Sequence, residues 1–566
     1  MNAPQIGCLF LLLAFAPTTL LHAENRTYDG VGNNLANVDW GAANTQLSRI
    51  ATPDYGDGIA SMAGATRPNP RDISNAVGAI AALLPNNRHL RSYVWQWGQF
   101  LDHDIDLMPG GGDAADIAVP TGDPDFDPMG SGAVVIPFSR SMYDMSTGTS
   151  ISNPRQQVNA ITSFIDASNV YGSSEERANA LRSNIGGRLL MSGDGLLPVN
   201  TMGLPNANDS HMYPDEDLAI AGDVRANEQV GLTAMHTLFV REHNRLAAEI
   251  EIANPGWSDE QIYQRSRKIV GAQMQVITYQ EFLPAVLGPY APGVESVYDE
   301  SVNPSISNEF ATAIYRLGHS MIGEELMRVQ NDGQVAPGGH LSMMDAFFNP
   351  TILHSSEELD FILKGLSVQQ MREVDTSLVD DLRNFLFGPP GAGGFDLLSL
   401  NLQRGRDHGL PDYNSVRAAY GLPERSFEEI SSDPIIVDAL VSLYDNDPSN
   451  IDLWVGALAE DHMPGASAGE LLTTGIVDQF VRLRDGDRFW YRNDADFTDF
   501  EIQELEATRL SDIIIRNTGI DFMQERVMLV PEPPYGIGWL VGCLAFVARW
   551  SRSIRKSLVT HDHSNC

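Results

Sequence analysis

The apolar residues of this 566-residue chain recur at steps of three and four along much of its length. Residues 90–101 show this spacing, and it returns in five further segments, residues 228–252, 259–282, 307–317, 359–363 and 427–443. Such a period places apolar side chains on one face of a helix, whereas the alternation that marks a half-buried strand is scarce here. The sequence therefore predicts a mainly α fold with little β structure.

Composition indicates one large folded body in residues 24–529. Apolar residues make up 43% of the chain and charged residues 20%, which supports a packed core. Neither an internal repeat nor a low-complexity linker divides the middle of the sequence. Residues 26–71 are rich in Asn, Gly, Asp and Pro and are predicted to form an arm along the surface. Residues 108–132 are predicted to form a long loop around the preceding helix.

The charge of the chain is strongly negative. It has 37 Lys and Arg residues against 74 Asp and Glu residues, which gives a formal net charge of −37. Binding to nucleic acid rests mainly on clustered Lys and Arg that neutralise phosphates, and no basic stripe precedes the last twenty residues. We therefore expect no nucleic acid partner.

Residues 1–23 resemble a secretory signal peptide. Residues 6–16 are almost wholly apolar, and residues 21–23 resemble a cleavage site ahead of the polar Glu24. No Lys or Arg precedes the apolar run, which leaves a buried N-terminal helix as the alternative. All three cysteines lie at the ends of the chain, so no disulfide is expected within the body.

Residues 530–556 resemble a bacterial PEP-CTERM sorting signal. Val530-Pro531-Glu532-Pro533-Pro534 is followed by an apolar run, residues 535–548, and then by four basic residues. The run is shorter than the roughly 20 residues that span a bilayer, and a short tail, residues 557–566, follows it. An amphipathic docking helix is the alternative. The signal implies transient membrane association and, with the signal peptide, a protein secreted by, or held at the outer surface of, a Gram-negative bacterium.

Several polar side chains are concentrated in residues 97–106, at the end of a predicted helix. Positions four apart share a helix face, so Gln99 and His103 point the same way, while Asp102 and Asp104 are rotated by about 100° to either side. One segment can thus offer a base and an amide to a cavity and two carboxylates to different neighbours. A solvated helix end is the alternative.

Oxygen-bearing side chains alternate in residues 162–168. Thr162, Asp166 and Ser168, with the backbone carbonyls between them, supply the hard oxygen ligands that Ca²⁺ prefers. An Asx or Ser/Thr turn would use the same oxygens for its own backbone. A further carboxylate would favour the cation, and Asp104 is the candidate.

Arg225 and Glu228 stand three residues apart at the opening of a long predicted helix. This spacing lets both side chains face one cavity, although such a pair is more commonly a surface ion pair. His236 and His243, further along the same helix, are interpreted as packing or capping histidines rather than metal ligands.

A lone histidine, His319, follows a predicted apolar helix, and Asn401 lies in a later polar segment, residues 400–411. Most single histidines are satisfied core or surface groups, but haem needs only one strong protein ligand. Such a ligand also needs an acceptor that orients its second N–H group, and the Asn401 amide could serve.

Taken in this order, the four segments resemble the animal-type haem peroxidases of the peroxidase-cyclooxygenase superfamily. The similarity covers nearly the whole body, residues 26–529. Several motifs in the order of the family are far more specific than any one of them. The resemblance implies a single, mainly helical haem-peroxidase domain over residues 24–529.

The resemblance assigns roles to the residues on both sides of the haem. His103 resembles the distal base, Arg225 the distal arginine and Gln99 the distal glutamine. On the opposite side, His319 matches the proximal ligand of the iron, and Asn401 matches its hydrogen-bond partner.

The resemblance also implies that a haem b-derived group is attached covalently. In this family two carboxylates form ester links to the haem, and Asp102 and Glu228 stand at the matching positions. Some members add a sulfonium link from a methionine at the next position, but here that residue is Gln229, so a third link is not expected. Arg316 and Arg404 match arginines that hold the haem propionates, a role that their fixed positive charge suits.

A Ca²⁺ site is implied as well. The matching ligands are Asp104, Thr162, Asp166 and Ser168 through their side chains and Phe164 through its backbone.

The activity implied is the oxidation of halide, thiocyanate or phenolic donors by hydrogen peroxide. One alternative is a haem-dependent fatty-acid dioxygenase of the same superfamily, which uses a tyrosine three residues before the proximal histidine. Arg316 occupies that position here, and Tyr315 lies four residues away. The other alternative is a catalytically silent extracellular adhesion or matrix protein that keeps the fold.

Overall fold

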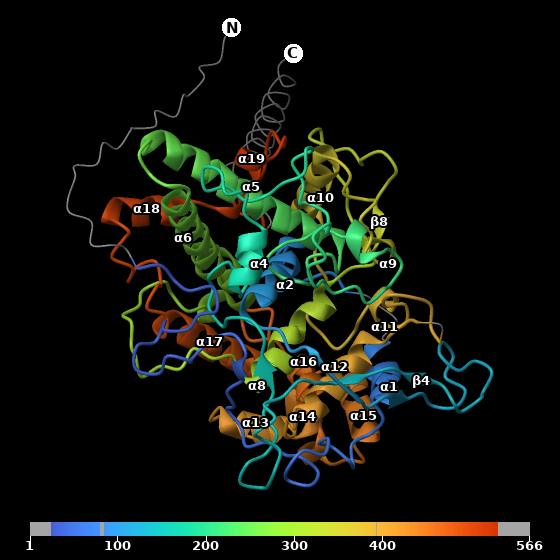
Figure 1. Cartoon of the computed structure of the whole chain (residues 1–566). Helices are drawn as coiled ribbons and strands as arrows, with labels where there is room; N and C mark the ends of the chain where they lie inside the picture. The colour runs from blue at the N-terminus through green and yellow to red at the C-terminus, as the bar shows by residue number, and fades with distance from the viewer. Residues whose placement is uncertain (1–23, 80–83, 392, 530–566) are drawn as a thin grey trace, which may run out of the picture. The chain divides into compact units, whose positions relative to one another are not determined.

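The computed structural model describes residues 24–79, 84–391 and 393–529 (Figure 1). The predicted signal peptide, residues 1–23, the predicted sorting segment, residues 530–556, and the tail, residues 557–566, lie outside the described residues and stay predictions. Within the described residues, no helix combines the length and the apolar character that a membrane crossing requires.

Three long helices form the upper part of the body in Figure 1: α2 (Tyr93–Ile105), α5 (Val230–Ala253) and α6 (Asp259–Ile277). Helix α5 packs against both α2 and α6. The rings of Trp97 and Phe100 on α2 meet the ring of Phe239 on α5, with centroids 5.8 and 5.1 Å apart. Aromatic contacts at such distances add to the free energy gained by burying the rings, so α2 is fixed in the core.

The local sequence explains where these helices begin. The side chain of Ser258 accepts a hydrogen bond from the Gln261 N–H, and the Gln261 side chain accepts one in return from the backbone of Ser258. This reciprocal cap satisfies N–H groups that have no partner inside helix α6. At the start of α5, the Gln229 side chain accepts from the N–H of Gly231.

A second group of helices forms the lower part of the body. It comprises α8 (Asn308–Thr312), the 3₁₀ helix η5 (Ile314–Met321), α12 (Leu397–Asp407), α16 (Leu453–Ala459) and α17 (Glu470–Asp485). Helix η5 packs against α2, α8, α16 and α17, which brings the two groups together.

The other described helices connect and cover these two groups. The α-helices are α1 (Pro70–Ile73), α3 (Ser168–Tyr171), α4 (Glu175–Ala180), α7 (Leu283–Leu287), α9 (Met343–Ala346), α10 (Ser356–Val368), α11 (Asp380–Arg383), α13 (Tyr413–Ala419), α14 (Phe427–Ile430), α15 (Pro434–Leu443), α18 (Asp499–Ala507) and α19 (Leu510–Asn517). The π-helices are η1 (Ser74–Gly78) and η3 (Thr278–Phe282), and the remaining 3₁₀ helices are η2 (Asp215–Asp217), η4 (Gly288–Tyr290) and η6 (Pro448–Asn450).

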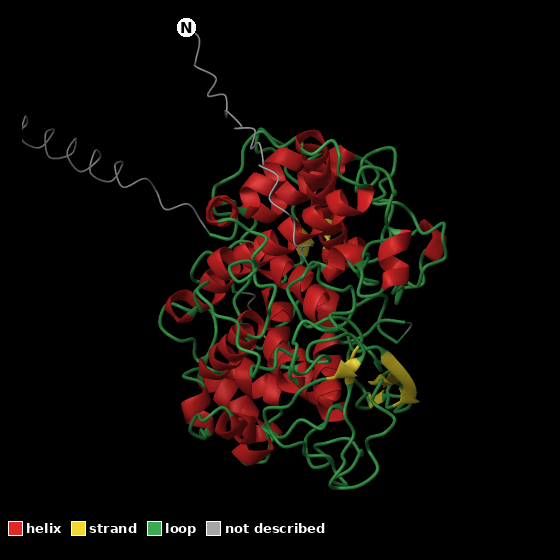
Figure 2. Cartoon of the chain, turned by 60° about the vertical axis from the view of Figure 1, so that its left-hand side comes forward, coloured by secondary structure: helices red, strands yellow, loops and turns green. Residues whose placement is uncertain are grey.

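The described strands are short and form antiparallel pairs. The pairs are β1 (Thr45–Gln46) with β6 (Val158–Asn159), β2 (Gly110–Ala114) with β5 (Ser139–Ser141), β3 (Ile117–Ala118) with β4 (Val135–Ile136), and β7 (Glu325–Leu326) with β8 (Leu341–Ser342). Figure 2 shows helices throughout the body and few strands. The prediction of a mainly α fold is therefore confirmed.

Some predicted segments differ from the structure. Residues 108–132 are not wholly a loop, because they contain β2 and β3. Residues 427–443 form two helices, α14 and α15, since Asp433 caps the second one and Pro434 occupies its first turn. Residues 307–317 likewise change from the α-helix α8 to the tighter helix η5. These breaks follow local capping and backbone geometry, which apolar spacing does not report.

Candidate active site

A cavity of about 750 Å³ lies between α2, the turn that precedes α5, η5 and α12. Its volume falls within the range of roughly 300–1,000 Å³ that is usual for small-molecule and cofactor sites. Every residue predicted for the haem side lines it: Gln99, Asp102, His103, Arg225, Glu228, Arg316, His319, Asn401 and Arg404. The structure thus brings together segments that are up to 300 residues apart in the sequence.

Helix α2 supplies one wall of the cavity, the His103 wall. Gln99, Asp102 and His103 all line the cavity, whereas Asp104 points away from it. The Gln99 Nε2 group donates to Glu228 Oε2 at 3.0 Å, and the same oxygen lies 3.5 Å from His103 Nε2. The two carboxylates that flank His103 also reach different neighbours, as the helix geometry predicts. Asp102 lies at the cavity, whereas Asp104 is bonded to Asn169 on the other side of α2.

Arg225 and Glu228 complete the His103 wall from the turn just before α5, which begins at Val230. The guanidinium of Arg225 donates to the backbone oxygen of Asp106 at 2.8 Å and lies 3.7 Å from the Asp102 carboxylate. The prediction that Arg225 and Glu228 face one cavity holds, although a turn rather than a helix places them.

Asp223 lies directly behind this wall, and the sequence reasoning missed it. It accepts hydrogen bonds from the backbone N–H of Arg225 at 2.8 Å and from its Nε and Nη2 atoms, both at 2.9 Å. Its Oδ1 atom also lies 3.5 Å from His103 Nδ1. The sequence signal was a carboxylate two residues before Arg225, which by itself is common in turns.

Burial and charge shift the pKa values along the His103 wall. Burial, helped by the Arg225 charge, holds the pKa of His103 well below its usual value, so the imidazole is neutral near pH 7. Burial raises the pKa of Glu228 to about 7 and also raises that of Asp102. Burial acts in the same direction on Asp223, but the charge of Arg225 and its hydrogen bonds lower the net pKa of this carboxyl, which is therefore ionised.

The opposite wall, the His319 wall, consists of η5 and α12. In a 3₁₀ helix, side chains three residues apart lie above one another, so Arg316 and His319 share the side that faces the cavity. Asn401 on α12 reaches His319, with its Nδ2 atom 2.9 Å from His319 Nδ1, and its Oδ1 atom accepts from Arg316 Nη1 at 3.1 Å. Burial lowers the pKa of His319 to about 3, which keeps this imidazole neutral.

The orientation of the Asn401 amide differs from the expected one. The sequence reasoning expected the amide to accept the Nδ1–H of His319, but its nitrogen faces that atom because its oxygen is bonded to Arg316. Such an orientation places the imidazole proton on Nε2, whereas a ligand that binds iron through Nε2 carries its proton on Nδ1. Iron ligation by His319 therefore requires the Asn401 amide to turn over.

Besides the nitrogens Nδ1 of His103 and Nε1 of Trp95, two side-chain oxygens at the cavity are buried without a hydrogen-bond partner among the described residues. They are Oδ2 of Asp106 and Oη of Tyr315. The ring of Tyr315 stacks on Phe310 with centroids 4.7 Å apart, and it still lines the cavity. Buried polar atoms without partners are uncommon in folded proteins, so these two are suited to meet a polar ligand. Neither residue was singled out as a cavity ligand by the sequence reasoning.

Arg404 is held more firmly than its predicted role suggests. Its Nη1 atom donates to the backbone oxygen of Ser139 at 3.0 Å and to Ser141 Oγ at 2.7 Å. Its guanidinium also lies over the ring of Phe138, 4.3 Å from the centroid. Burial lowers the pKa of Arg404 to about 10, so it remains charged near pH 7 and can attract an anionic group in the cavity.

The predicted cation ligands meet on the other side of α2. The carboxylate of Asp104 accepts from the backbone N–H groups of Asp166, Ala167 and Asn169 at 3.1, 3.2 and 3.1 Å, and from Ser168 Oγ at 3.0 Å. Both Thr162 Oγ1 and the backbone N–H of Ser168 donate to Asp166, at 3.2 and 3.0 Å. Phe164 is fully buried in the same loop.

Two buried carboxylates so close together create an unfavourable environment for negative charge. Burial raises the pKa of Asp104 well above its usual range, and the neighbouring Asp166 adds to the shift. Burial also raises the pKa of Asp166, although Arg26 partly offsets this with its Nε atom 4.0 Å from the carboxylate. The oxygens of this loop fit a hard cation in their chemistry. Among the described residues, however, no group of three or more His, Cys, Asp and Glu side chains surrounds a point suited to a metal.

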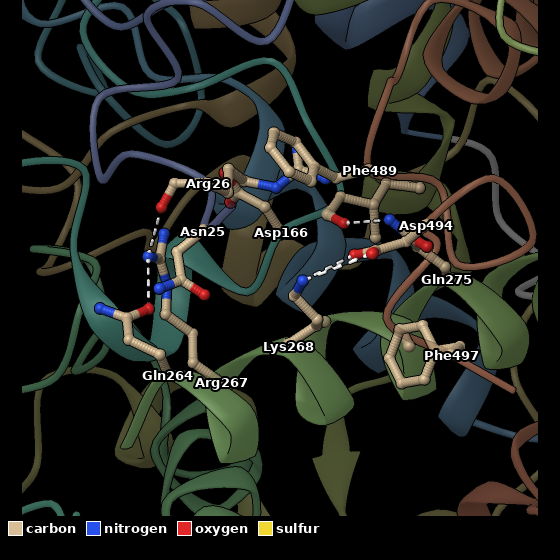
Figure 3. A pocket seen from close by; sticks show the side chains of 13 residues that line it. Asn25, Arg26, Asp166, Gln264, Arg267, Lys268, Gln275, Phe489, Asp494 and Phe497 are labelled. Atoms are coloured by element: carbon tan, nitrogen blue, oxygen red, sulfur yellow. Dashed lines mark hydrogen bonds and ion pairs between the residues drawn. The ribbon is translucent and has the colours of Figure 1, made fainter. Parts of the chain in front are cut away.

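Figure 3 shows the surroundings of Asp166 on the outer side of this loop. The Arg267 Nη1 atom donates to the backbone oxygen of Arg26 at 2.8 Å, and Lys268 forms an ion pair with Asp494 at 3.0 Å. Arg26 itself donates to Asp487 at 2.8 Å. The predicted arm, residues 26–71, is thus tied to the body directly beside the candidate cation loop.

The two histidines of α5 pack in the core, in agreement with the interpretation of them as packing or capping residues. His236 and His243 are fully buried, and His243 is bonded to Tyr171 Oη at 2.9 Å. His236 packs against the Phe100 ring, with centroids 5.0 Å apart. Both act in packing.

Comparison with known proteins agrees with this architecture. The family model described as animal haem peroxidase matches residues 25–528. Peroxinectin A from Dictyostelium discoideum is 37% identical over 520 residues, which cover 89% of this chain and 95% of that protein. Human thyroid peroxidase is 36% identical, and the match covers 92% of this chain but 62% of that longer protein. The chain belongs to the animal haem peroxidase family, whose members bind haem, and it is a peroxidase.

Solved structures show the same fold. Peroxidase A from Dictyostelium discoideum has a TM-score of 0.84 at 36% sequence identity, and the match covers 90% of this chain and all of that one. A fatty acid alpha-dioxygenase from Arabidopsis thaliana has a TM-score of 0.74 at 20% identity, with 90% of this chain and 85% of that chain covered. The second likeness concerns the fold alone.

Proposed function

We propose that this protein uses hydrogen peroxide to oxidise small donors, halide or thiocyanate ions or phenols, with haem bound between His103 and His319. The observation that carries the proposal is that both imidazoles line one cavity of about 750 Å³, together with Arg225 and Asn401. The unpartnered Oδ2 atom of Asp106 and the charged Arg404 fit a prosthetic group with polar edges.

The residues of the His103 wall handle the proton. The bound haem supplies an iron centre that accepts the oxidising equivalents of the peroxide. His103 is neutral near pH 7, so its Nε2 atom can take a proton from hydrogen peroxide and return it to the departing oxygen. The fixed charge of Arg225 stabilises the negative charge that develops on that oxygen.

The covalent anchors that we propose are Asp102 and Glu228. Both carboxylates line the cavity, from α2 and from the turn before α5, and could form ester links at two points of a haem b-derived group. The Gln99 amide holds Glu228 in place through the 3.0 Å hydrogen bond. Arg316 and Arg404 line the cavity on the other side, where they would attract the propionates.

We also propose Ca²⁺ as a second cofactor. Its ligands would be the side-chain oxygens of Asp104, Thr162, Asp166 and Ser168 and the backbone oxygen of Phe164. The support is the presence of two buried carboxylates with only partial compensation by Arg26. A divalent cation would neutralise this charge and fix α2 to the loop, a structural role rather than a redox role.

The proposed location is outside the inner membrane of a Gram-negative bacterium, secreted or at the outer surface. It rests on the predicted signal peptide, residues 1–23, and on the predicted sorting segment, residues 530–556, which would bring transient membrane association. Fractionation of cells that produce either the full chain or the chain without residues 530–566 tests the export of the protein and its membrane association. Retention of the full chain in the cytoplasm would contradict the proposal.

A fatty-acid dioxygenase remains the second candidate because of Tyr315. Its hydroxyl is buried, has no hydrogen-bond partner in the part of the chain that the structure describes, and belongs to a side chain that lines the cavity. Against it, Arg316 rather than a tyrosine stands three residues before His319 and is bonded to Asn401. Oxygen uptake with a long-chain fatty acid, measured without peroxide, distinguishes this activity from the peroxidase.

The proposed function is tested on the purified, haem-loaded protein. The expected results are a Soret band, a shift of this band on addition of hydrogen peroxide, and its return when a halide or phenol is added. Extraction with acidic organic solvent should leave the haem on the protein, and Asp102→Asn with Glu228→Gln should release it. A haem-loaded protein that is silent toward peroxide would favour the adhesion or matrix role.

A further inference from the structure

The carboxylate of Asp223 lies behind the His103 wall and contacts both residues that act on the peroxide. The side chain is almost fully buried, with 3% of the residue exposed. Its two oxygens bond to Nε and Nη2 of Arg225, and Oδ1 lies 3.5 Å from Nδ1 of His103. A single carboxylate therefore faces the base and the cation at the same time.

The contact with Arg225 fixes the direction of its guanidinium. Two parallel N–H···O bonds, from Nε and Nη2 to the two oxygens of one carboxylate, allow little rotation of the guanidinium plane. The third bond, from the backbone N–H of Arg225, ties the turn itself to the same carboxylate at 2.8 Å. The remaining amine of the guanidinium, Nη1, is then directed toward Asp102 at the cavity, 3.7 Å away.

The contact with His103 determines which ring nitrogen carries the proton. Nδ1 of His103 is buried and has no hydrogen-bond partner among the described residues, and the acceptor beside it is Asp223. Glu228 Oε2 lies at the same 3.5 Å from Nε2, but that oxygen already accepts a hydrogen bond from Gln99. The acceptor that faces Nδ1 therefore favours the tautomer with its proton on Nδ1. Nε2 then presents a lone pair to the cavity. The 3.5 Å distance is longer than a formed hydrogen bond, and such contacts often tighten when the substrate binds.

We propose that Asp223 is a positioning residue that makes His103 and Arg225 one catalytic unit. It orients the His103 ring with its basic nitrogen toward the peroxide and stabilises the ring while it holds the transferred proton. It also aligns the Arg225 guanidinium beside the departing oxygen. This inference rests on the proposed function, because it concerns the peroxide step of that reaction.

The distinguishing measurement compares two peroxides in stopped flow. Hydrogen peroxide is a weak acid and needs a base to ionise it, whereas a peroxyacid such as meta-chloroperoxybenzoic acid ionises more easily. Loss of the positioning carboxylate should therefore slow the reaction with hydrogen peroxide more than the reaction with the peroxyacid. A general loss of structure would slow both reactions.

The variant Asp223→Asn keeps the size of the side chain and removes its charge. In the haem-loaded protein, the rate constant with hydrogen peroxide should fall by about 10- to 100-fold, which is part of the roughly 10²- to 10⁴-fold that a positioned acid–base group contributes. The reaction with the peroxyacid depends less on proton transfer to His103, so it should slow by less than about threefold. The subsequent oxidation of a phenolic donor should be unchanged, since it does not use His103 as a base.

Two further variants keep the test decisive. Asp223→Glu retains the charge and should preserve the wild-type ratio between the two peroxides, even if both reactions slow. Asp217→Asn removes an exposed carboxylate from the preceding short helix η2 and should leave every rate at the wild-type value. If Asp223→Asn takes up no haem, the role of Asp223 is judged from the ratio of the two peroxide rate constants in Asp223→Glu, compared with the same ratio in Asp217→Asn.

Equal slowing of the two peroxides in Asp223→Asn, or an unchanged rate with hydrogen peroxide, would overturn the role of Asp223. A changed ratio in Asp223→Glu would do the same. In each of these cases the wild-type protein reacts with peroxide and the proposed function stands. If the wild-type haem-loaded protein does not react with hydrogen peroxide at all, the proposed function fails and the inference fails with it.

Discussion

The two walls of the cavity are built from different chemistry. The His103 wall is crowded with ionisable groups, because Asp223 and Glu228 each lie 3.5 Å from the imidazole, and Arg225 contacts both Asp223 and Asp102. On the His319 wall the imidazole contacts an uncharged amide, that of Asn401. Both rings are neutral near pH 7 because both are buried. In the proposed function, the partners of each buried, neutral imidazole determine whether it serves in proton transfer or in metal ligation.

The largest effect is expected at the His319 wall. His319→Ala removes the nitrogen proposed to bind iron, and no other histidine lines the cavity on that side. We expect the Soret band to change position and weaken, with peroxidase activity lost by at least about 10³-fold, since the metal ligand itself is gone. His354→Ala, at an exposed position, is the control. A normal spectrum and turnover in His319→Ala would refute the proposed ligand.

A somewhat smaller effect is expected at the His103 wall. His103→Gln replaces the imidazole base with an uncharged amide of similar length. The rate constant with hydrogen peroxide should fall by about 10²- to 10⁴-fold, the usual contribution of a positioned acid–base group. The haem content and the iron ligand should be retained, which absorption spectra can check. Loss of the haem in this variant would show that the two walls are not functionally separate.

A negative charge placed beside His319 tests the difference directly. Asn401→Asp keeps the acceptor for Arg316 and puts a carboxylate beside His319 Nδ1. A carboxylate partner makes the ring a stronger donor to iron. We expect the reduction potential of the iron to become more negative by about 60 mV, which corresponds to a tenfold change for one electron. Asn401→Ala, which has no acceptor, should not shift the potential in this direction.

The smallest effect concerns pH. A free imidazole with a pKa of about 6.5 would lose about three quarters of its basic form at pH 6. Because the pKa of His103 is held well below that value, the basic form persists as the pH falls through 6.5 and is lost only at more acidic pH. The rate constant with hydrogen peroxide should therefore change by less than about twofold between pH 8 and pH 6. A loss of half or more at pH 6.5 would contradict this.

The helical class could be predicted from the sequence because it depends on short, local patterns. Gln99 and His103 share a helix face through their four-residue spacing, and both line the cavity. The roles of these residues in catalysis stay predictions. The pairing of His103 with Arg225 was not predictable from spacing, and it came from the order of motifs typical of a family.

Other features depended on tertiary structure that the sequence does not display. Asp223 became visible only when the turn before α5 was placed against α2, since its contact with His103 spans 120 residues. The 3₁₀ geometry of η5 could not be read from apolar spacing. Such spacing does not separate the roughly 3.0 residues per turn of a 3₁₀ helix from the roughly 3.6 of an α-helix. The amide orientation of Asn401 depended on Arg316, which the sequence reasoning had assigned to another partner.

One residue of α3, Asn169, connects the two sites described above through its backbone. The N–H of Asn169 donates to the Asp104 carboxylate at 3.1 Å, and the C=O of the same residue accepts from the N–H of Asp223 at 2.9 Å. A shift of the candidate cation loop would thus be passed on, through a single residue, to the carboxylate behind His103. If the proposed Ca²⁺ is bound in that loop, its chelation should slow the proposed reaction with hydrogen peroxide before the haem is lost.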